Sequence, residues 1–469
     1  MQDYTIVILE RGKCSWGKCY FCGWGKRYIN TPINVLKSKF LKAIERKAYG
    51  IKIFGSGSFL DENQFPLEFV KWCITTAKER GFKEIIFESR PEFITEDKLN
   101  EIKVEGIKIS IAIGLEVADN DILLKYYNKG FTVKDYLEAV NQLREHSLGV
   151  RTYVLVNGHP ILYKNPDLQR RVLDKTIELV TQVSDSVVII NAYPHKDSKL
   201  LIDWMNKEWY PLDKKEFFSL VYGILNKYNA SKLNEKVFIV KREDREVIVE
   251  LDFDNFNFIP RIPRKLQTFI RGVGKEVLLH PHFEIWQDFF IRFYTPPSER
   301  KYVLFLPCSF KKPYKRSKTH KAIIKALSGY PWFRKLHLIV VSTPGVVPWE
   351  FHTRYPFTHY DWPEWEETEE VKKEYIEITK ERVKKFVNAH KDNYKLFFAY
   401  FHLESETLEA IKQAFNELGL KDKLVVVLDR ETYEKIKQEY GNKRIGSSVV
   451  RHPLAIEKLK QVLKEHISM

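Results

Sequence analysis

The chain contains an apolar stretch, Thr5-Ile-Val-Ile-Leu9, followed after four residues by the cysteine-rich stretch Cys14-Ser-Trp-Gly-Lys-Cys19-Tyr-Phe-Cys22. These two stretches are the strongest indication of the fold and of the chemistry. Three of the chain's five cysteines lie here. The apolar run is typical of a buried strand, so the cysteines are expected on the loop that leaves it. Three thiolates on one short loop can bind three corners of a cubane iron–sulfur cluster, and the fourth iron is then open to a substrate.

Zinc is the alternative metal for such a loop. A structural zinc site needs four protein ligands, and zinc motifs normally supply them in pairs. No second Cys-x-x-Cys follows, and Cys73 and Cys308 are distant in the sequence. The pattern therefore favours iron–sulfur over zinc, and a zinc-stabilised RNA-binding protein without catalysis is the alternative from a different class.

Strand and helix patterns alternate as far as about residue 195. Strands are predicted at 4–9, 51–54, 84–87, 108–113, 151–156 and 187–191, and helices at 34–48, 67–80, 133–146 and 167–183. This alternation predicts a parallel sheet with right-handed crossovers. Six such units predict an α/β fold, namely an open, partial (β/α)6 barrel within residues 1–230.

Two further segments are predicted after residue 230. Residues 231–299 contain a β-hairpin at 237–251 and a basic linker at 261–275, both candidates for RNA contact. Alternation resumes in residues 300–469, with strands at 302–306, 335–341, 395–400 and 423–428. This last segment is expected to form a second, three-layer α/β domain.

Composition bounds the partners and the compartment. The 469 residues carry a formal charge of +15, which favours a polyanion such as RNA. A solvated, lysine-rich surface explains the charge equally well. No apolar stretch approaches the roughly 20 residues of a membrane span, and the start of the chain lacks a signal segment. Few, bunched cysteines indicate a reducing compartment, so a cytoplasmic location is expected.

Polar residues follow several predicted strands at the sheet edge where α/β proteins bind ligands. They are Gly55, Ser56, Gly57 and Ser58 after the second strand, Glu88, Ser89 and Arg90 after the third, and Glu116 after the fourth. Glycines let the backbone approach a ligand closely. The charged side chains can neutralise or bind the carboxylate, the sulfonium and the ribose hydroxyls of a ligand that carries these groups. The alternative for each residue is a salt-bridged rim that stabilises the barrel.

The cysteine loop and these strand ends resemble radical S-adenosylmethionine (SAM) enzymes. The Cys-x-Phe-Cys ending fits, although four residues separate the first two cysteines where three are usual. The resemblance implies that Phe21 and the eight strand-end residues above contact the cofactor SAM. The segments 57–61, 88–92, 114–116 and 128–131 resemble the Elongator catalytic-subunit branch, and more closely its archaeal relative, the radical-SAM enzyme of archaeosine formation. The resemblance implies that Cys14, Cys19 and Cys22 ligate a [4Fe–4S] cluster whose open iron binds SAM.

Cys308 follows an apolar strand and stands beside five lysine and arginine residues, ahead of a predicted helix. Such positive charge is expected to push the thiol toward thiolate. The cysteine could then attack an electrophilic carbon, while His320 or a lysine moves protons. A buried, inert cysteine beside a phosphate-binding face is an equally good interpretation of the residues alone.

The spacing around Cys308 resembles the catalytic domain of archaeosine synthases over residues 300–420. The matching positions are Pro307, Cys308, Lys312, Pro313, Tyr314, Ser317 and His320, with further likeness at 347–350, 355–356 and 360–363. The resemblance implies catalytic roles for Cys308, Lys312, Tyr314, Ser317 and His320. Members of this family join lysine to a nitrile-bearing 7-deazaguanine in the tRNA D loop.

Together the two resemblances predict a fused archaeosine-forming enzyme of lyase and transferase type that acts on tRNA. The C-terminal domain adds free lysine to the cyano carbon, and the N-terminal domain breaks the lysine carbon–nitrogen bond by radical chemistry. In a narrower alternative the chain performs only the radical step, and the C-terminal domain docks tRNA or a partner. The chain shows neither the transglycosylase-like domain nor the PUA domain of archaeosine synthases, so a separate synthase subunit is an expected partner. The reductant leaves no signal in the sequence.

Overall fold

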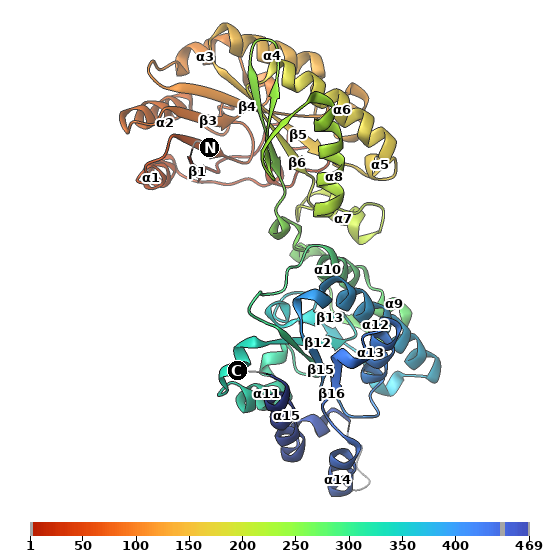
Figure 1. Cartoon of the computed structure of the whole chain (residues 1–469). Helices are drawn as coiled ribbons and strands as arrows, with labels where there is room; N and C mark the ends of the chain where they lie inside the picture. Colours follow the sequence, from red (N-terminus) through yellow and green to blue (C-terminus); the bar gives the residue numbers. More distant parts are fainter. Residues whose placement is uncertain (1–2, 441–445, 468–469) are drawn as a thin grey trace. The chain divides into compact units, whose positions relative to one another are not determined.

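The computed structural model describes residues 3–440 and 446–467. The chain divides into two compact units, Met1–Arg261 and Ile262–Met469. Both are of the α/β class predicted from the alternation of apolar strands and amphipathic helices, as Figure 1 shows.

Within the described residues, the first unit contains a nine-stranded sheet in the order β1-β2-β3-β4-β5-β6-β9-β8-β7. The strands are β1 (Tyr4–Ile8), β2 (Gly50–Phe54), β3 (Glu84–Glu88), β4 (Lys108–Glu116), β5 (Gly149–Val156), β6 (Ser186–Asn191), β7 (Ser231–Asn234), β8 (Val237–Lys241) and β9 (Glu246–Asp252). The first six follow sequence order and pair in parallel. This is the arrangement predicted for the partial barrel, with β1 and β7 as the outermost strands of an open sheet.

Helices surround the outside of this sheet in Figure 1. They are α1 (Ile33–Ala43), α2 (Leu67–Glu79), α3 (Glu96–Ile102), α4 (Val133–Glu145), α5 (Pro160–Tyr163), α6 (Pro166–Val183), α7 (Lys199–Met205) and α8 (Lys214–Leu225). In α6 the buried side chains recur every three or four residues, for example Val172, Thr176 and Val180. That spacing places one apolar stripe against the strands, and the strand ends remain open at the sheet edge.

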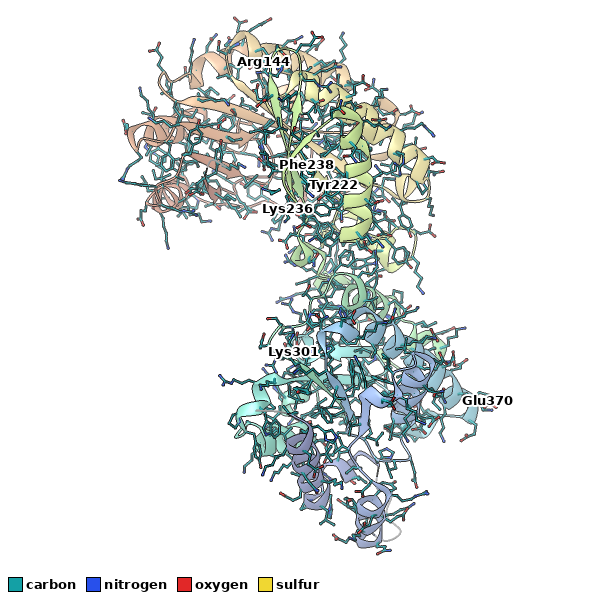
Figure 2. All side chains as sticks on the ribbon, viewed as in Figure 1. Arg144, Tyr222, Lys236, Phe238, Lys301 and Glu370 are labelled. Carbon is teal, nitrogen blue, oxygen red and sulfur yellow. The ribbon has the colours of Figure 1, made fainter. Side chains whose placement is uncertain are left out.

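The predicted β-hairpin forms, but it belongs to the first unit rather than to a separate segment. Strands β8 and β9 pair antiparallel, and β9 also pairs in parallel with β6. Tyr222 on α8 and Phe238 on β8, labelled in Figure 2, pack with ring centroids 5.3 Å apart. The hairpin thus covers the edge of β6, whose backbone groups would otherwise be unpaired. The segment predicted as 231–299 is therefore divided between the two units.

The second unit contains, among the described residues, a five-stranded sheet in the order β13-β12-β11-β15-β16. These strands are β11 (Tyr302–Pro307), β12 (Leu336–Ser342), β13 (Gly345–Pro348), β15 (Leu396–Ala399) and β16 (Leu424–Val426). All neighbours are parallel except β12 and β13. The central strand β11 is buried along Tyr302–Leu306, as expected for a parallel strand that is covered on both faces.

Two groups of helices flank this sheet in Figure 1. One group contains α9 (Lys275–Leu278), α10 (Pro281–Arg292), α12 (Glu369–His390) and α13 (Glu406–Glu417), and the other contains α11 (Lys318–Leu327), α14 (Arg430–Tyr440) and α15 (Pro453–His466). Helix α10 packs on α12, so the second unit begins well before residue 300. A short parallel pair, β10 (Ile270–Arg271) with β14 (Tyr360–Asp361), carries Tyr360 to the site of Cys308. No helix within the described residues is long and apolar enough to cross a membrane.

Candidate active site

The cysteine loop follows β1 and is tied down at several points. Gly12 and Ile29 exchange two backbone hydrogen bonds, of 2.7 and 2.9 Å, which close the loop at its base. The Trp16 indole donates to the backbone oxygen of Asn128 at 2.7 Å, and the Tyr20 amide donates to that of Tyr127 at 3.0 Å. Backbone and indole groups therefore hold the loop, and its three thiols are left free of disulfides.

Two glycines let the cysteine loop approach its surroundings closely. A Cβ atom on Gly25 would lie 2.8 Å from the Cβ of Cys14, and one on Gly23 would lie 2.9 Å from the Cβ of His195. Both distances are shorter than non-bonded carbon atoms tolerate. The loop can therefore fold over Cys14 and against the segment after β6 only because these two positions lack side chains.

The three thiols share one cavity of about 430 Å³ at the carboxyl ends of the parallel strands. Its wall includes Cys14, Cys19, Cys22, Phe21, Gly55, Ser56, Gly57, Glu88, Ser89, Arg90, Glu116, Lys129 and Tyr153. The volume lies in the range of small-molecule sites. We call this space the cofactor cavity. No three His, Cys, Asp or Glu side chains of the described residues are grouped so that they could hold a single metal ion.

Eight of the nine residues predicted to contact the cofactor line this cavity, and Ser58 is the ninth. Ser58 is buried behind the wall, where its hydroxyl accepts a hydrogen bond of 3.0 Å from the Arg90 amide. These residues gather in one cavity because parallel strands bring their carboxyl ends to the same edge of the sheet. A position at a strand end does not by itself tell a residue that faces the cavity from one that supports its wall.

Gln64 shapes the glycine-rich segment after β2. Its side-chain oxygen accepts from the Ser58 amide at 2.9 Å, and its amide nitrogen donates to the Arg11 carbonyl at 3.0 Å. A Cβ on Gly57 would lie 2.1 Å from the Gln64 oxygen. Gln64 is completely buried, so it cannot move aside into solvent. A glycine is therefore required where this backbone faces the cavity.

Glu88 is the acid at the end of β3. Burial raises its pKa to about 7, although the Gly55 amide and the Tyr153 hydroxyl donate hydrogen bonds to it. The Gly55 nitrogen lies 3.3 Å from Oε2 of Glu88. Near neutral pH this carboxyl can therefore exist in either protonation state beside the glycine segment.

Glu116 and Lys129 form a buried ion pair, with 3.0 Å between Oε1 and Nζ. Burial lowers the pKa of Lys129, but the Glu116 carboxylate and the nearby Cys19 outweigh that effect and the pKa is raised. Glu116 has a φ of 72° beside a register shift in the pairing of β4 with β5. Glu116 thus lines the cavity from a bulged position with strained backbone.

Several residues of the cavity wall were not predicted as site residues. They include Glu10, Trp24, Lys26, Lys129 and Tyr153. Tyr153 lies inside an apolar strand, but it stands two positions after Arg151 and so shares its face of the sheet. Because side chains at alternate positions of a strand share a face, Arg151 and Tyr153 could have been read as a polar face of β5, which would have predicted Tyr153 as a site residue. Lys129 lies in a segment that resembles radical-SAM enzymes, but it was not singled out there.

Cys308 directly follows β11 in the second unit, and of the two interpretations of its sequence its surroundings agree better with the buried cysteine than with the thiolate. Burial raises the pKa of the Cys308 thiol, and the Lys312 ammonium opposes this only in part. Of the five basic neighbours in the sequence, Lys312 is the one whose charge acts on the thiol. Sequence proximity did not reveal that removal from water outweighs the local positive charge.

A hydroxyl network lies next to Lys312. The Lys312 nitrogen stands 3.9 Å from the centroid of the Tyr360 ring. The Tyr360 hydroxyl lies 2.7 Å from that of Tyr314 and 2.9 Å from that of Ser342. Burial lowers the pKa of Lys312, which Cys308 and Asp361 counteract in part. Tyr360 and Ser342 were not predicted as catalytic residues, because they come from other strands.

Ser317 and His320 lie behind this network at the start of α11. Ser317 caps the helix by accepting from the His320 amide at 3.1 Å, and its hydroxyl lies 2.8 Å from Nδ1 of His320. Burial lowers the pKa of His320 to about 4, so its ring is neutral. The ring stacks on Tyr314 with centroids 5.4 Å apart. Of the five predicted catalytic residues, these two therefore contact each other, and His320 also contacts the ring of Tyr314.

Two family matches cover these two sites. Residues 12–165 match the Radical SAM superfamily, and residues 284–439 match a domain of unknown function, DUF5591. The first unit therefore contains a radical-SAM domain, a class whose cofactors are a [4Fe–4S] cluster and SAM. The three free thiols and the size of the cofactor cavity fit both groups. This match favours iron–sulfur over the zinc alternative.

Curated relatives come from archaea. A protein of Methanocaldococcus jannaschii, described as uncharacterised, is 38% identical over 171 residues, or 33% of this chain and 46% of the relative. The archaeosine synthase subunit beta of Methanosarcina acetivorans is 27% identical over 33% of this chain and 49% of that protein. The subunit alpha of Thermoplasma acidophilum is 28% identical over 28% of this chain and 26% of that protein.

The chain thus spans about half of the length of the first two relatives and about a quarter of the third. It is similar to both subunit types of archaeosine synthase. This double similarity matches the two resemblances found in the sequence, one around the cysteine loop and one around Cys308.

Proposed function

We propose that the protein is a tRNA-modifying enzyme of archaeosine formation, with its radical step in the first unit. One observation carries the proposal: a single cavity holds three free thiols together with eight of the nine residues expected to contact SAM. Similarity to archaeosine synthase subunits alpha and beta supports tRNA as the substrate. The positive charge of +15 is consistent with an RNA partner.

In this proposal Cys14, Cys19 and Cys22 ligate the [4Fe–4S] cluster. With SAM bound, this group supplies a 5′-deoxyadenosyl radical that removes a hydrogen atom. The backbone of Gly55 to Gly57 is the candidate contact for the amino group of SAM, because the missing side chains allow close approach. Arg90 is the candidate partner of the SAM carboxylate.

Glu116 is the candidate contact for the ribose hydroxyls of SAM. Its bulged backbone and its ion pair with Lys129 hold the carboxylate in one orientation. Such fixed polar groups in a largely apolar cavity orient a ligand before reaction and cost no rearrangement during it. The substrate in the proposal is a lysine joined through an amidine to 7-deazaguanine, and its carbon–nitrogen bond breaks to leave the formamidine of archaeosine.

The second unit is proposed to add lysine to the cyano carbon of the base. Burial favours a neutral Cys308 thiol and lowers the pKa of Lys312. Because burial lowers the pKa of Lys312, its amine is the candidate acceptor of the thiol proton as sulfur attacks the nitrile carbon, so the pair needs no preformed thiolate. The linked hydroxyls of Tyr314 and Tyr360 are the candidate hydrogen-bond donors to the developing nitrogen anion. Ser317 and His320 hold Tyr314 in place.

The narrower alternative, a docking role for the second unit, has an observation in its favour. Three large aromatic side chains of the second unit are exposed: Phe269 by 61%, Phe310 by 85% and Trp365 by 70%. Exposed rings beside basic residues are typical of surfaces on which RNA bases stack. A docking surface of this kind would need no reactive cysteine, in agreement with the raised pKa of Cys308.

Incubation of the chain with lysine and nitrile-bearing tRNA, in the absence of SAM, distinguishes a catalytic second unit from a docking one. Nucleoside mass spectrometry should detect a lysine adduct that Cys308→Ala abolishes and Cys73→Ala retains, since Cys73 is buried in α2. No adduct with the wild-type chain would favour docking.

The radical step is tested separately with lysine-adduct tRNA, SAM and a chemical reductant. The wild-type chain with its cluster should form archaeosine, whereas Cys14→Ala, Cys19→Ala and Cys22→Ala should not. Archaeosine formation by the triple variant would refute the radical step.

A further inference from the structure

A second cavity, of about 400 Å³, lies beside the cofactor cavity in the first unit. Glu10 and Trp24 line both spaces, so the two share a wall. The other walls come from the loops after β1 and β6 and from the segment after β9. These three strands run parallel, so the cavity opens at the same sheet edge as the cofactor cavity. The proposed radical chemistry leaves this space unused.

Three basic side chains give the second cavity its charge. Arg27, Lys196 and Arg261 are exposed, and in the parts of the chain that the structure describes none of them forms an ion pair. Two acids, Glu10 and Asp197, also line the space. Glu10 stands on the wall shared with the cofactor cavity, so the remaining rim carries an excess of positive charge. Such a rim suits an anionic ligand, because guanidinium groups bind phosphate oxygens with charge-assisted hydrogen bonds.

Aromatic rings form the second chemical feature. The rings of Tyr193 and His195 stack with centroids 4.6 Å apart, and Trp24 meets His195 edge-on at 4.7 Å. Burial and the Arg261 charge lower the pKa of His195 to about 4, so this ring is uncharged at neutral pH. Trp24 is 49% exposed. An apolar ring with an open face is a stacking surface for a planar base.

The second cavity is held in place by the same contacts that position the cysteine loop. The Lys26 ammonium donates to the backbone oxygen of Asp197 at 2.9 Å, which links this loop to the segment after β6. Gly23 permits the close approach to His195 described above. A preformed wall of this kind reduces the entropy that a ligand loses on binding.

We propose that the second cavity binds an RNA nucleotide that neighbours the base under modification. The nucleotide base stacks against Trp24 and His195, and its phosphate contacts Arg27, Lys196 and Arg261. The shared wall then directs the adjoining nucleotide toward the cofactor cavity. The inference rests on the proposed function only for RNA as the source of the nucleotide, since the cavity itself indicates a planar ring joined to an anion.

Calorimetric titration of the full chain, with its cluster in place, tests the site without turnover. Guanosine 5′-monophosphate should bind, whereas guanosine or inorganic phosphate alone should bind roughly tenfold more weakly. Arg261→Ala and Arg27→Ala should each weaken binding of the monophosphate roughly tenfold. Arg80→Ala is the matched control, because this exposed arginine at the end of α2 lies at the opposite edge of the sheet. Equal affinity in all three variants, or no binding to the wild-type chain, would overturn the proposal.

A short single-stranded RNA separates this inference from the proposed function. It should compete with the monophosphate, and its affinity should depend less on salt in Arg261→Ala than in Arg80→Ala. If the wild-type chain forms no archaeosine but Arg261 still controls nucleotide binding, the proposed function fails and the nucleotide site stands. If archaeosine forms while every variant binds nucleotide and RNA alike, the nucleotide site fails and the proposed function stands.

Discussion

Lys129 donates a hydrogen bond of 3.0 Å to Glu116 across the wall of the cofactor cavity, and both side chains are buried. Glu116 lies on a bulge of β4. Lys129 directly follows Asn128, whose backbone oxygen accepts a hydrogen bond from the Trp16 indole of the cysteine loop. The ion pair therefore connects the strand end to the cysteine loop. It couples the two halves of the proposed cofactor site through one contact.

We expect Lys129→Met to lower both stability and affinity for SAM. Its removal leaves the Glu116 carboxylate buried without its cation, which costs about 3 kcal/mol in the free energy of unfolding. Denaturant titration measures this loss, and equilibrium binding of SAM to the cluster-loaded chain measures the second effect. The matched control is Lys125→Met, because Lys125 and Asp121 also lie 3.0 Å apart but are both exposed. Equal stability of the two variants would contradict the assigned role of the buried pair.

The raised pKa of Glu88 predicts a pH dependence of stability. Its pKa is about 7 in the folded chain and near 4.3 when unfolded, so the folded state binds the proton more tightly. The resulting stabilisation is fully present below about pH 4 and is lost as the pH rises through 7. Glu88→Gln keeps the shape without the charge, and the variant should gain about 3 kcal/mol relative to the wild-type chain between pH 4 and pH 8.

Chemical unfolding of the cluster-free chain at several pH values checks this slope. Glu92→Gln serves as the control, since Glu92 lies only four residues further on and its side chain is 42% exposed. If the stabilities of the wild-type and Glu88→Gln chains changed in parallel with pH, the pKa of Glu88 would be the same in the folded and unfolded chains, and the raised pKa would be refuted.

Most of the secondary structure could be predicted because its signals are local. Apolar runs predicted the first six strands of the first unit, and the cysteines were correctly expected after β1. The pairing of β9 with β6 was missed, because a hairpin shows its own turn but not the sheet edge that it will cover. That pairing places the hairpin in the first unit, which ends at Arg261.

The candidate sites were predictable to the extent that topology gathers residues at one edge. Parallel strand ends brought the glycines and acids of the first unit to one cavity. The environment of Cys308 was not predictable, since Tyr360 and Ser342 reach Lys312 and Tyr314 only through tertiary packing. Charges adjacent in sequence were counted as neighbours of the thiol, but burial of the thiol was the larger effect.

Gly57 offers a steric test of the cofactor cavity. Gly57→Ala places a Cβ 2.1 Å from the buried Gln64 oxygen, so the segment must shift away from its present position. We expect a loss of about 1–3 kcal/mol in stability and a weaker affinity for SAM. Gly223→Ala in α8 is the control, because its new Cβ meets nothing closer than 3.6 Å. That variant should be unchanged or more stable, since alanine favours helices. A normal affinity for SAM in Gly57→Ala would remove this segment from the binding site.

The reactivity of Cys308 tests the charge balance in the second unit. Because burial raises its pKa, alkylation by iodoacetamide should reach half of its maximal rate above the usual thiol value of about 8.5. Lys312→Met removes the cation that opposes this shift and should move the midpoint still higher. Lys311→Met, one position away, should leave it unchanged, and peptide mass spectrometry across a pH series measures all three chains. If Lys311→Met moved the midpoint as far as Lys312→Met, general positive charge rather than Lys312 would control the thiol. The proposed proton transfer between Cys308 and Lys312 would then have no basis.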